Sequence, residues 1–225
     1  MAVVTVEEAL RLWDEALQTQ VHKVETIDVK TAKGYVLADD IIAPTDVPAF
    51  PKSAMDGYAI TFKADCNEYI VDGIIGAGVV WEHPVESGHA VRIMTGAPVP
   101  DTCDTVIMQE QVVGSGEPGT TITIQGNYKC GDHIIPQGEE CSAGTTVIPR
   151  GTEVTSTVQT ILTGLGFTEI TVNAMPRVLV LTSGHEVIEP GESLTPGKIY
   201  NSNRAMICGL LEDLGFHKIT HYHVS

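Results

Sequence analysis

Apolar residues recur every three or four positions near the start of the chain, which predicts an amphipathic helix from about residue 5 to residue 19. The segment Thr5-Val6-Glu7-Glu8 is a capping-box signature that marks the beginning of this helix. We expect the helix to pack its Trp13 face inward. The apolar positions are Val6, Ala9, Leu10, Trp13, Ala16 and Leu17.

Between about residues 45 and 142 the pattern changes to short apolar runs separated by glycine turns. Such runs favour β-strands, and the intervening Gly and Pro residues favour turns. We therefore predict an all-β module here. The clearest strands are predicted at residues 69–71, 90–94, 105–108 and 121–124, with breaks at 114–116 and 117–119.

The last part of the chain alternates strand and helix patterns. Helical spacing from Thr155 to Leu165 ends at Gly166, and a continuous apolar run at 177–181 is typical of a strand buried on both faces. An amphipathic helix follows, with Asn201-Ser202-Asn203 as capping candidates and Gly215 at its end, and 218–224 is predicted as the next strand. This order is a β–loop–α–β unit, the beginning of a parallel sheet.

These patterns predict a fold of the class α/β plus β with several domains. We expect an elongated, helix-containing dimerisation domain made of residues 1–44 and 143–175. The β module, residues 45–142, is inserted between these two segments. Residues 176–225 would form the start of an α/β domain, incomplete because one such unit cannot cover both faces of its strands.

The net charge of the chain excludes some classes of function. The 225 residues carry 13 Lys+Arg against 29 Asp+Glu, a net charge of −16, which argues against binding to nucleic acid or to an anionic membrane surface. No run approaches the ~18 apolar residues of a transmembrane helix, and no signal-peptide pattern opens the chain. We therefore expect a cytoplasmic protein.

Cysteine and histidine add little to this picture. The five cysteines include no CxxC pair and are interpreted as reduced thiols. A histidine cluster near the end of the sequence has two interpretations, metal ligands or solvated imidazoles on a terminal strand, and the second is favoured. It consists of His217, His221 and His223.

One carboxylate, Asp56, stands on a turn whose conformation is restricted. Pro44, Pro48 and Pro51 precede it and favour an extended chain, while Gly57 follows it and favours a turn. Judged from these residues alone, an Asx-turn in which Asp56 holds its own backbone is favoured over an active-site acid.

Three further segments are candidates for binding an anion. The loop 182–186 leaves the carboxyl end of a predicted strand, where open α/β sheets bind ligands. The helix beginning at 201–204 adds free N–H groups and a guanidinium. The segment 92–100 runs from a strand into a Gly/Pro turn with Thr95 exposed. The alternatives are an ordinary turn, a helix cap and a β-turn, respectively.

Four motifs then occur in one order: SAMDGYA at 53–59, RIMTGAPVP at 92–100, the loop 182–186 ahead of Glu189-Pro190-Gly191, and PGKIYNSNRAM at 196–206. Together they resemble the molybdopterin molybdenumtransferase family, the bacterial enzyme related to the gephyrin E domain. The resemblance implies insertion of molybdate into adenylated molybdopterin with release of AMP, aided by a divalent cation such as Mg²⁺. It also implies a homodimer whose active cleft lies between the α/β domain of one subunit and the β module of the other.

The resemblance assigns roles residue by residue and leaves the metal ligands unassigned. It implies that Asp56 is the acid of the active cleft, with Glu139, from the family's Gly-Glu-Asp segment, as a second catalytic acid. The residues implied to bind substrate are Arg92, Thr95, Thr182, Ser183, Gly184, Glu186, Ser202, Asn203 and Arg204.

The sequence also departs from the family pattern. His185 stands where the family usually has Asp, Glu140 stands where the Gly-Glu-Asp segment has its Asp, and no Glu occurs near Val158. The family also continues beyond residue 225 with further loops and a small β domain. We therefore expect an N-terminal fragment or a degenerate copy that is poorly active alone, and a non-catalytic dimerising or scaffolding module is the alternative.

Overall fold

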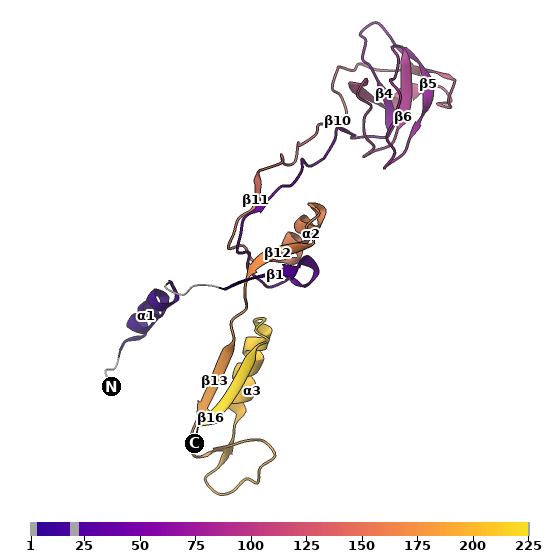
Figure 1. Ribbon diagram of the computed structural model, residues 1–225. Helices are drawn as coiled ribbons and strands as arrows, with labels where there is room; N and C mark the ends of the chain where they lie inside the picture. Colours follow the sequence, from indigo (N-terminus) through magenta and orange to yellow (C-terminus); the bar gives the residue numbers. More distant parts are fainter. Residues whose placement is uncertain (1–3, 19–22, 225) are drawn as a thin grey trace. The chain divides into compact units, whose positions relative to one another are not determined.

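A computed structural model describes residues 4–18 and 23–224, and Figure 1 shows its helices and strands. The described residues divide into two compact units. One unit comprises Ile42–Val147, and the other comprises the described residues of Met1–Ile41 together with Ile148–Ser225. The boundaries predicted near residues 44, 142 and 175 remain predictions.

The helices are α1 (Val6–Gln18), α2 (Ser156–Gly164) and α3 (Ser202–Asp213), with 3₁₀ turns η1 (Val29–Thr31) and η2 (Gln109–Gln111). The strands are β1 (Val24–Asp28), β2 (Ile41–Ile42), β3 (Lys52–Ser53), β4 (Gly57–Ile60), β5 (Glu68–Ile75), β6 (His89–Ile93), β7 (Thr105–Met108), β8 (Val112–Val113), β9 (Thr121–Ile124), β10 (Ile134–Ile135), β11 (Thr146–Ile148), β12 (Glu169–Asn173), β13 (Val178–Ser183), β14 (Val187–Ile188), β15 (Ile199–Tyr200) and β16 (Ile219–Val224).

The unit Ile42–Val147 is built on a six-stranded mixed sheet with the order β7-β4-β6-β5-β9-β8. The pair β5–β6 is parallel and the other neighbours are antiparallel. Side chains on both faces of the sheet are buried in hydrophobic clusters, so β4 in particular buries all four of its residues. Apart from the 3₁₀ turn η2, the regular elements in the described residues of this unit are strands. This agrees with the pattern of apolar runs, and a separate module with the bounds 45–142 remains a prediction.

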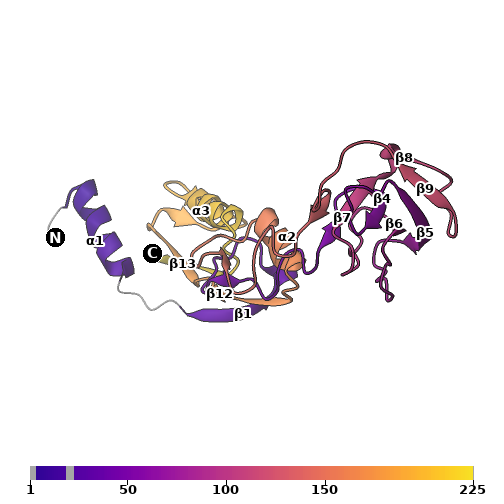
Figure 2. The same cartoon turned by 90° about the horizontal axis from the view of Figure 1, so that it is seen from above.

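In the other unit, β1 pairs with β12 in antiparallel register, with Ile27 opposite Ile170 (Figure 2). The turn η1 follows β1, and its Val29 carbonyl accepts a hydrogen bond of 2.6 Å from Gln159 Nε2 of α2. Helix α2 begins where predicted because the Thr155 hydroxyl caps it. Parts of the chain on either side of the β module, β1 with η1 and β12 with α2, therefore contact each other. The domain predicted from residues 1–44 and 143–175 remains a prediction.

The β–loop–α–β prediction is also confirmed, because β13 and β16 are paired in parallel and α3 lies between them in the chain. The prediction that β13 is buried on both faces is wrong. Val180 and Thr182 are buried, whereas Leu179 is 54% exposed and Leu181 is 61% exposed. The reason is that the described sheet has two strands, and the alternating burial along both shows that one face is covered.

Helix α1 forms as its periodicity predicts, but the prediction that its Trp13 face packs inward is wrong. The helix buries none of its residues, and Trp13 is 70% exposed. Amphipathic spacing fixes which side chains share a face but supplies no neighbour to cover that face. Within the described residues, no helix is long and apolar enough to cross a lipid bilayer.

Candidate functional site

The carboxylate of Asp56 is held by a turn far away in the sequence. Asp56 lies between β3 and β4, and its Oδ1 accepts hydrogen bonds of 2.7 Å from both the backbone N–H and the hydroxyl of Thr95. This contact joins residues 39 positions apart, so the carboxylate caps the Thr95 turn instead of its own. The Asx-turn alternative does not describe these bonds.

The backbone around this contact is fixed from both sides. The N–H of Ser53 donates to the carbonyl of Ala97 at 2.9 Å, and the N–H of Gly96 donates to the carbonyl of Ser53 at 2.8 Å. Gly96 adopts φ 79°, a conformation that glycine reaches without strain and that the tight turn requires. The motifs at 53–59 and 92–100 are therefore neighbours in one rigid arrangement.

The electrostatics favour an ionised Asp56. The hydrogen bond from the Thr95 hydroxyl, the bond from the Thr95 N–H and the positive charge of Arg92 lower the pKa of the Asp56 carboxyl. Arg92 also has a buried Nε without a hydrogen-bond partner among the described residues. Together, Asp56, Thr95 and Arg92 present an anionic oxygen next to a cationic group.

The predicted acid Glu139 is exposed and lies after β10. The next residue, Glu140, brings its Oε1 to 3.7 Å from Nζ of Lys52 in β3. Sequence reasoning did not single out Glu140 as a site residue. Glu140 could have been found from its position next to Glu139 in the acidic segment of the family.

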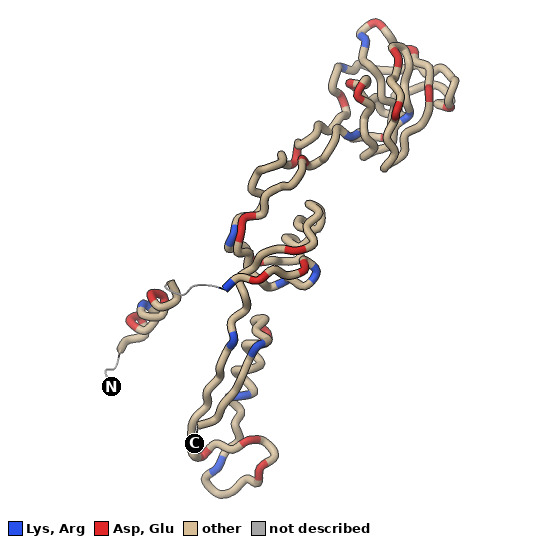
Figure 3. The backbone as a smooth tube through the Cα atoms, viewed as in Figure 1, with Lys and Arg blue, Asp and Glu red and all other residues tan. Residues whose placement is uncertain are grey.

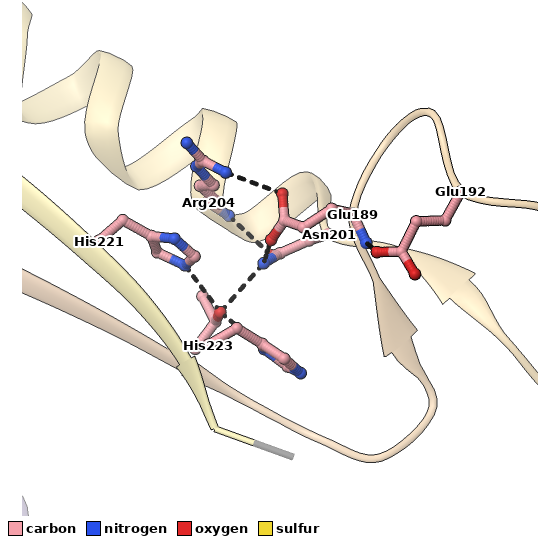
Figure 4. A network of polar contacts seen from close by, with 7 residues as sticks. Glu189, Glu192, Asn201, Arg204, His221 and His223 are labelled. Carbon is pink, nitrogen blue, oxygen red and sulfur yellow. Dashed lines mark hydrogen bonds and ion pairs between the residues drawn. The ribbon is translucent and has the colours of Figure 1, made fainter.

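In the other unit, the predicted loop and helix start meet at one hydroxyl group (Figure 4). Thr182 is buried at the end of β13, and its Oγ1 lies 3.0 Å from Nδ2 of Asn201, 2.9 Å from Nε2 of His221 and 3.1 Å from Nδ1 of His223. Thr182 was predicted to bind substrate, and in the structure its hydroxyl joins β13, β16 and the start of α3.

The two histidines on β16 correct an expectation. The prediction of solvated imidazoles is wrong for His221 and His223, which are half-buried and bonded to Thr182. Alternation along β16 places both rings on the face that carries the buried Val180 and Thr182 of β13. His217, in contrast, is exposed. No group of three His, Cys, Asp or Glu suited to holding a metal ion occurs in residues 4–18 and 23–224.

Asn201 and Glu189 are bonded to this network, and the sequence did not assign them to the site. Asn201 is buried and caps α3, because its Oδ1 accepts from the N–H of Arg204 at 3.1 Å. Its Nδ2 donates to Glu189 Oε1 at 2.9 Å, and Arg204 Nη1 donates to Glu189 Oε2 at 2.9 Å. Hydrogen bonds from Asn201 and then from Arg204 lower the pKa of Glu189. The guanidinium predicted to bind phosphate is thus already paired on one side.

Three of the remaining predicted residues of this unit line an open space. Ser183, Ser202 and Asn203 line a cavity of about 360 Å³ that also contacts Thr182 and Asn201. At Gly184, with φ 141°, a side chain would meet the carboxylate of Glu186 at 2.8 Å. The Nζ of Lys198 donates to the carbonyl of His185. The end of β13 and the first turn of α3 therefore face a common cavity, whose lining includes neither Gly184 nor Glu186.

Replacing the cap residue tests this arrangement. We expect Asn201→Ala to lower the free energy of unfolding by about 2 kcal/mol, because it removes a helix cap and a donor to two buried or half-buried oxygens. Asn203→Ala is the matched control, because Asn203 is exposed in the first turn and caps nothing. Chemical denaturation of both variants gives the comparison, and equal stabilities would contradict the role of Asn201.

These features define a mixed α/β protein with a rigid β module and a βαβ unit whose loops are suited to binding an anion. The model of the MoeA N-terminal region (domain I and II) matches residues 4–166, more than half of the chain. The chain therefore belongs to the MoeA N-terminal family, and the resemblance noted in the sequence is confirmed.

Relatives and solved structures agree with this membership. The chain is 38% identical over 206 residues to the molybdopterin molybdenumtransferase of Staphylococcus epidermidis, covering 87% of this chain and 48% of that protein. It is 37% identical to the same enzyme of Haemophilus influenzae, with 85% and 48% covered. A crystal structure of the molybdopterin biosynthesis MoeA protein from Pyrococcus horikoshii matches with a TM-score of 0.86 at 30% identity, covering 99% of this chain and 60% of that one. The chain spans about half the length of the curated relatives it matches.

Proposed function

We propose that this chain is the N-terminal portion of an enzyme that inserts molybdate into adenylated molybdopterin and releases AMP. The observation that carries the proposal is the contact between Asp56 and Thr95, which brings two separate family motifs to one point. Relatives named molybdopterin molybdenumtransferase support it. In this function the substrates are two anions, molybdate and a nucleotide-linked pterin phosphate.

Because the protein carries a net negative charge, a small number of positive or hydrogen-bond-donating groups must bind the anionic substrates. Acidic residues outnumber basic residues in both units, as the red and blue segments of Figure 3 show. Anions are therefore held by local groups and not by a general positive field. Arg92 supplies one cation. The N–H of Gly184 already donates to the carbonyl of Val224 and the N–H of Arg204 to Oδ1 of Asn201, so the uncharged donors are the N–H groups of the first turn of α3 that the cap leaves unused.

The single carboxylate of Asp56 is compatible with a bound Mg²⁺ ion. Mg²⁺ in proteins is commonly held by one or two carboxylates, by waters and by substrate phosphates. Among the described residues, the hydrogen bonds to the Asp56 carboxylate reach Oδ1, so Oδ2 is the donor we assign to the ion. When bound, the ion neutralises charge on the phosphate and molybdate oxygens.

We also propose that the enzyme acts as a homodimer. The exposed apolar face of α1, which includes Leu10, Trp13 and Leu17, supports this. Covering such a face requires a neighbour. We expect Trp13→Glu to shift the full-length protein from dimer to monomer, because it places a charge in the apolar face.

Light scattering at micromolar concentration measures this shift. Glu15→Gln on the same helix is the control, because Glu15 is exposed and lies outside the apolar face, and it should leave the dimer unchanged. A wild-type protein that is monomeric at this concentration contradicts the dimer proposal.

The function itself is tested with the full-length protein, adenylated molybdopterin, molybdate and Mg²⁺. We expect AMP release that depends on molybdate. A folded, dimeric protein that releases no AMP would contradict the transferase and favour the scaffolding alternative.

A further inference from the structure

The hydroxyl of Thr182 lies within hydrogen-bond distance of three nitrogen atoms. The nitrogens belong to Asn201, His221 and His223, at 3.0, 2.9 and 3.1 Å. A hydroxyl donates one hydrogen bond and accepts two. Three bonds are therefore possible only if one of the three nitrogens carries no proton and accepts.

Asn201 cannot be the acceptor. Its Oδ1 must face the N–H of Arg204, which can only donate, and its Nδ2 must face the carboxylate of Glu189, which can only accept. These two bonds fix the orientation of the amide. The second hydrogen of Nδ2 is then donated to Thr182, and one of the two lone pairs of the hydroxyl is occupied.

One histidine must therefore supply the bare nitrogen. Nε2 of His223 lies 3.1 Å from the carbonyl oxygen of Gly184, which only accepts, so this Nε2 carries a proton. With both rings neutral, Nδ1 of His223 accepts from Thr182 and Nε2 of His221 donates to it. One added proton can bind to Nδ1 of His221 without changing these hydrogen bonds. If both rings are charged, however, Asn201, His221 and His223 all donate, and the Thr182 oxygen has only two lone pairs to accept them.

We propose that the Thr182 hydroxyl permits one of these histidines, but not both, to be protonated, so that a second proton loosens the loop 182–186. His221 and His223 then act as positioning residues for the loop that begins beside the first turn of α3, which we assign to phosphate binding, and in this respect the inference rests on the proposed function. The charged side chains joined to the network are Glu189 and Arg204, which pair with each other at 2.9 Å. Glu189 also lies near enough to His221 for the charges of the two side chains to interact.

The test follows hydrogen exchange of the amides at 182–189 in the full-length protein between about pH 8 and pH 5, where histidine changes charge. After correction for the intrinsic effect of pH on exchange, we expect roughly a tenfold rise in exchange rate at the acidic end, from the loss of one or two hydrogen bonds. Selective ¹⁵N labelling of histidine should show the proton of neutral His223 on Nε2.

Variants separate this mechanism from a general loss of structure in acid. His223→Asn places a carbonyl oxygen where Nδ1 was, so Thr182 keeps an acceptor at every pH and the acid-dependent rise should disappear. His217→Gln is the matched control, because His217 is exposed and outside the network, and it should keep the rise. A rise that persists in His223→Asn, or a wild type without one, would overturn the inference.

Binding of AMP, measured over the same pH range, distinguishes the two proposals. Affinity that falls with the loosening of the loop, and that does not fall in His223→Asn, supports both. If the loop loosens as expected but AMP does not bind at any pH, the proposed function fails and the two-histidine network stands.

Discussion

Replacing Asp56 by Asn in the full-length protein is expected to lower the rate of AMP release by about 10²–10³, the cost of losing one positioned electrostatic group. The amide oxygen of Asn can still accept from the N–H and hydroxyl of Thr95, so the turn keeps its hydrogen bonds. What the substitution removes is the negative charge, because the pKa of the Asp56 carboxyl is lowered and the wild-type group is ionised at neutral pH.

The matched control is Asp72→Asn, which also removes one carboxylate from the same unit. Asp72 pairs with His89 at 2.6 Å on the sheet and takes no part in the Thr95 contact. Its turnover should remain within about twofold of wild type, as for a surface change away from the site. Steady-state AMP release and the unfolding midpoint are measured for both variants.

Two outcomes would count against Asp56 as the active acid. Wild-type turnover in Asp56→Asn would show that the charge is dispensable. A variant that no longer folds would show that the carboxylate is needed for the turn itself, which is its structural interpretation.

Much of the fold follows from local signals in the sequence. Helix α2 was predictable because Thr155 caps its start and Gly166, with φ 85°, follows its end. The strands of the β module were predictable because short apolar runs alternate with turns. Each of these signals is contained within a few neighbouring residues.

The failures concern contacts that depend on distant parts of the chain. The apolar pattern predicts that Leu179 and Leu181 are buried, but their burial depends on how many strands and helices surround β13. The predicted burial of Trp13 is wrong for the same reason. A local pattern states that a face is apolar and leaves open what covers it.

In the candidate site, too, the sequence predicted local features but not the contacts between distant residues. The sequence located Asp56 and Thr95 as separate candidates, but it did not reveal their pairing, because pairing across 39 residues depends on sheet register. It missed the roles of Asn201 and Glu189 because their importance lies in the partners they connect. Motif resemblance found the positions, and the structure supplied the bonds.

The residue next to Asp56 is expected to give the largest effect on stability. Gly57 lies in β4, between β6 and β7, and a Cβ atom added there would be 1.9 Å from the carbonyl oxygen of Ile107. We expect Gly57→Ala to lower the free energy of unfolding of this unit by about 3 kcal/mol, at the upper end of the usual cost of overpacking. The obstacle is backbone, so no side-chain rotation can relieve it.

The control is Gly76→Ala, just after β5. A Cβ atom there meets no heavy atom within 4 Å, so the substitution should change stability by no more than about 0.5 kcal/mol. Hydrogen exchange of the β4 amides at increasing denaturant reports on this unit in both variants. Equal protection in the two variants would mean that β4 can move away from β7 at little cost. In that case Asp56, one residue earlier, would not be held rigidly, and its fixed position relative to Thr95 could not explain its role in turnover.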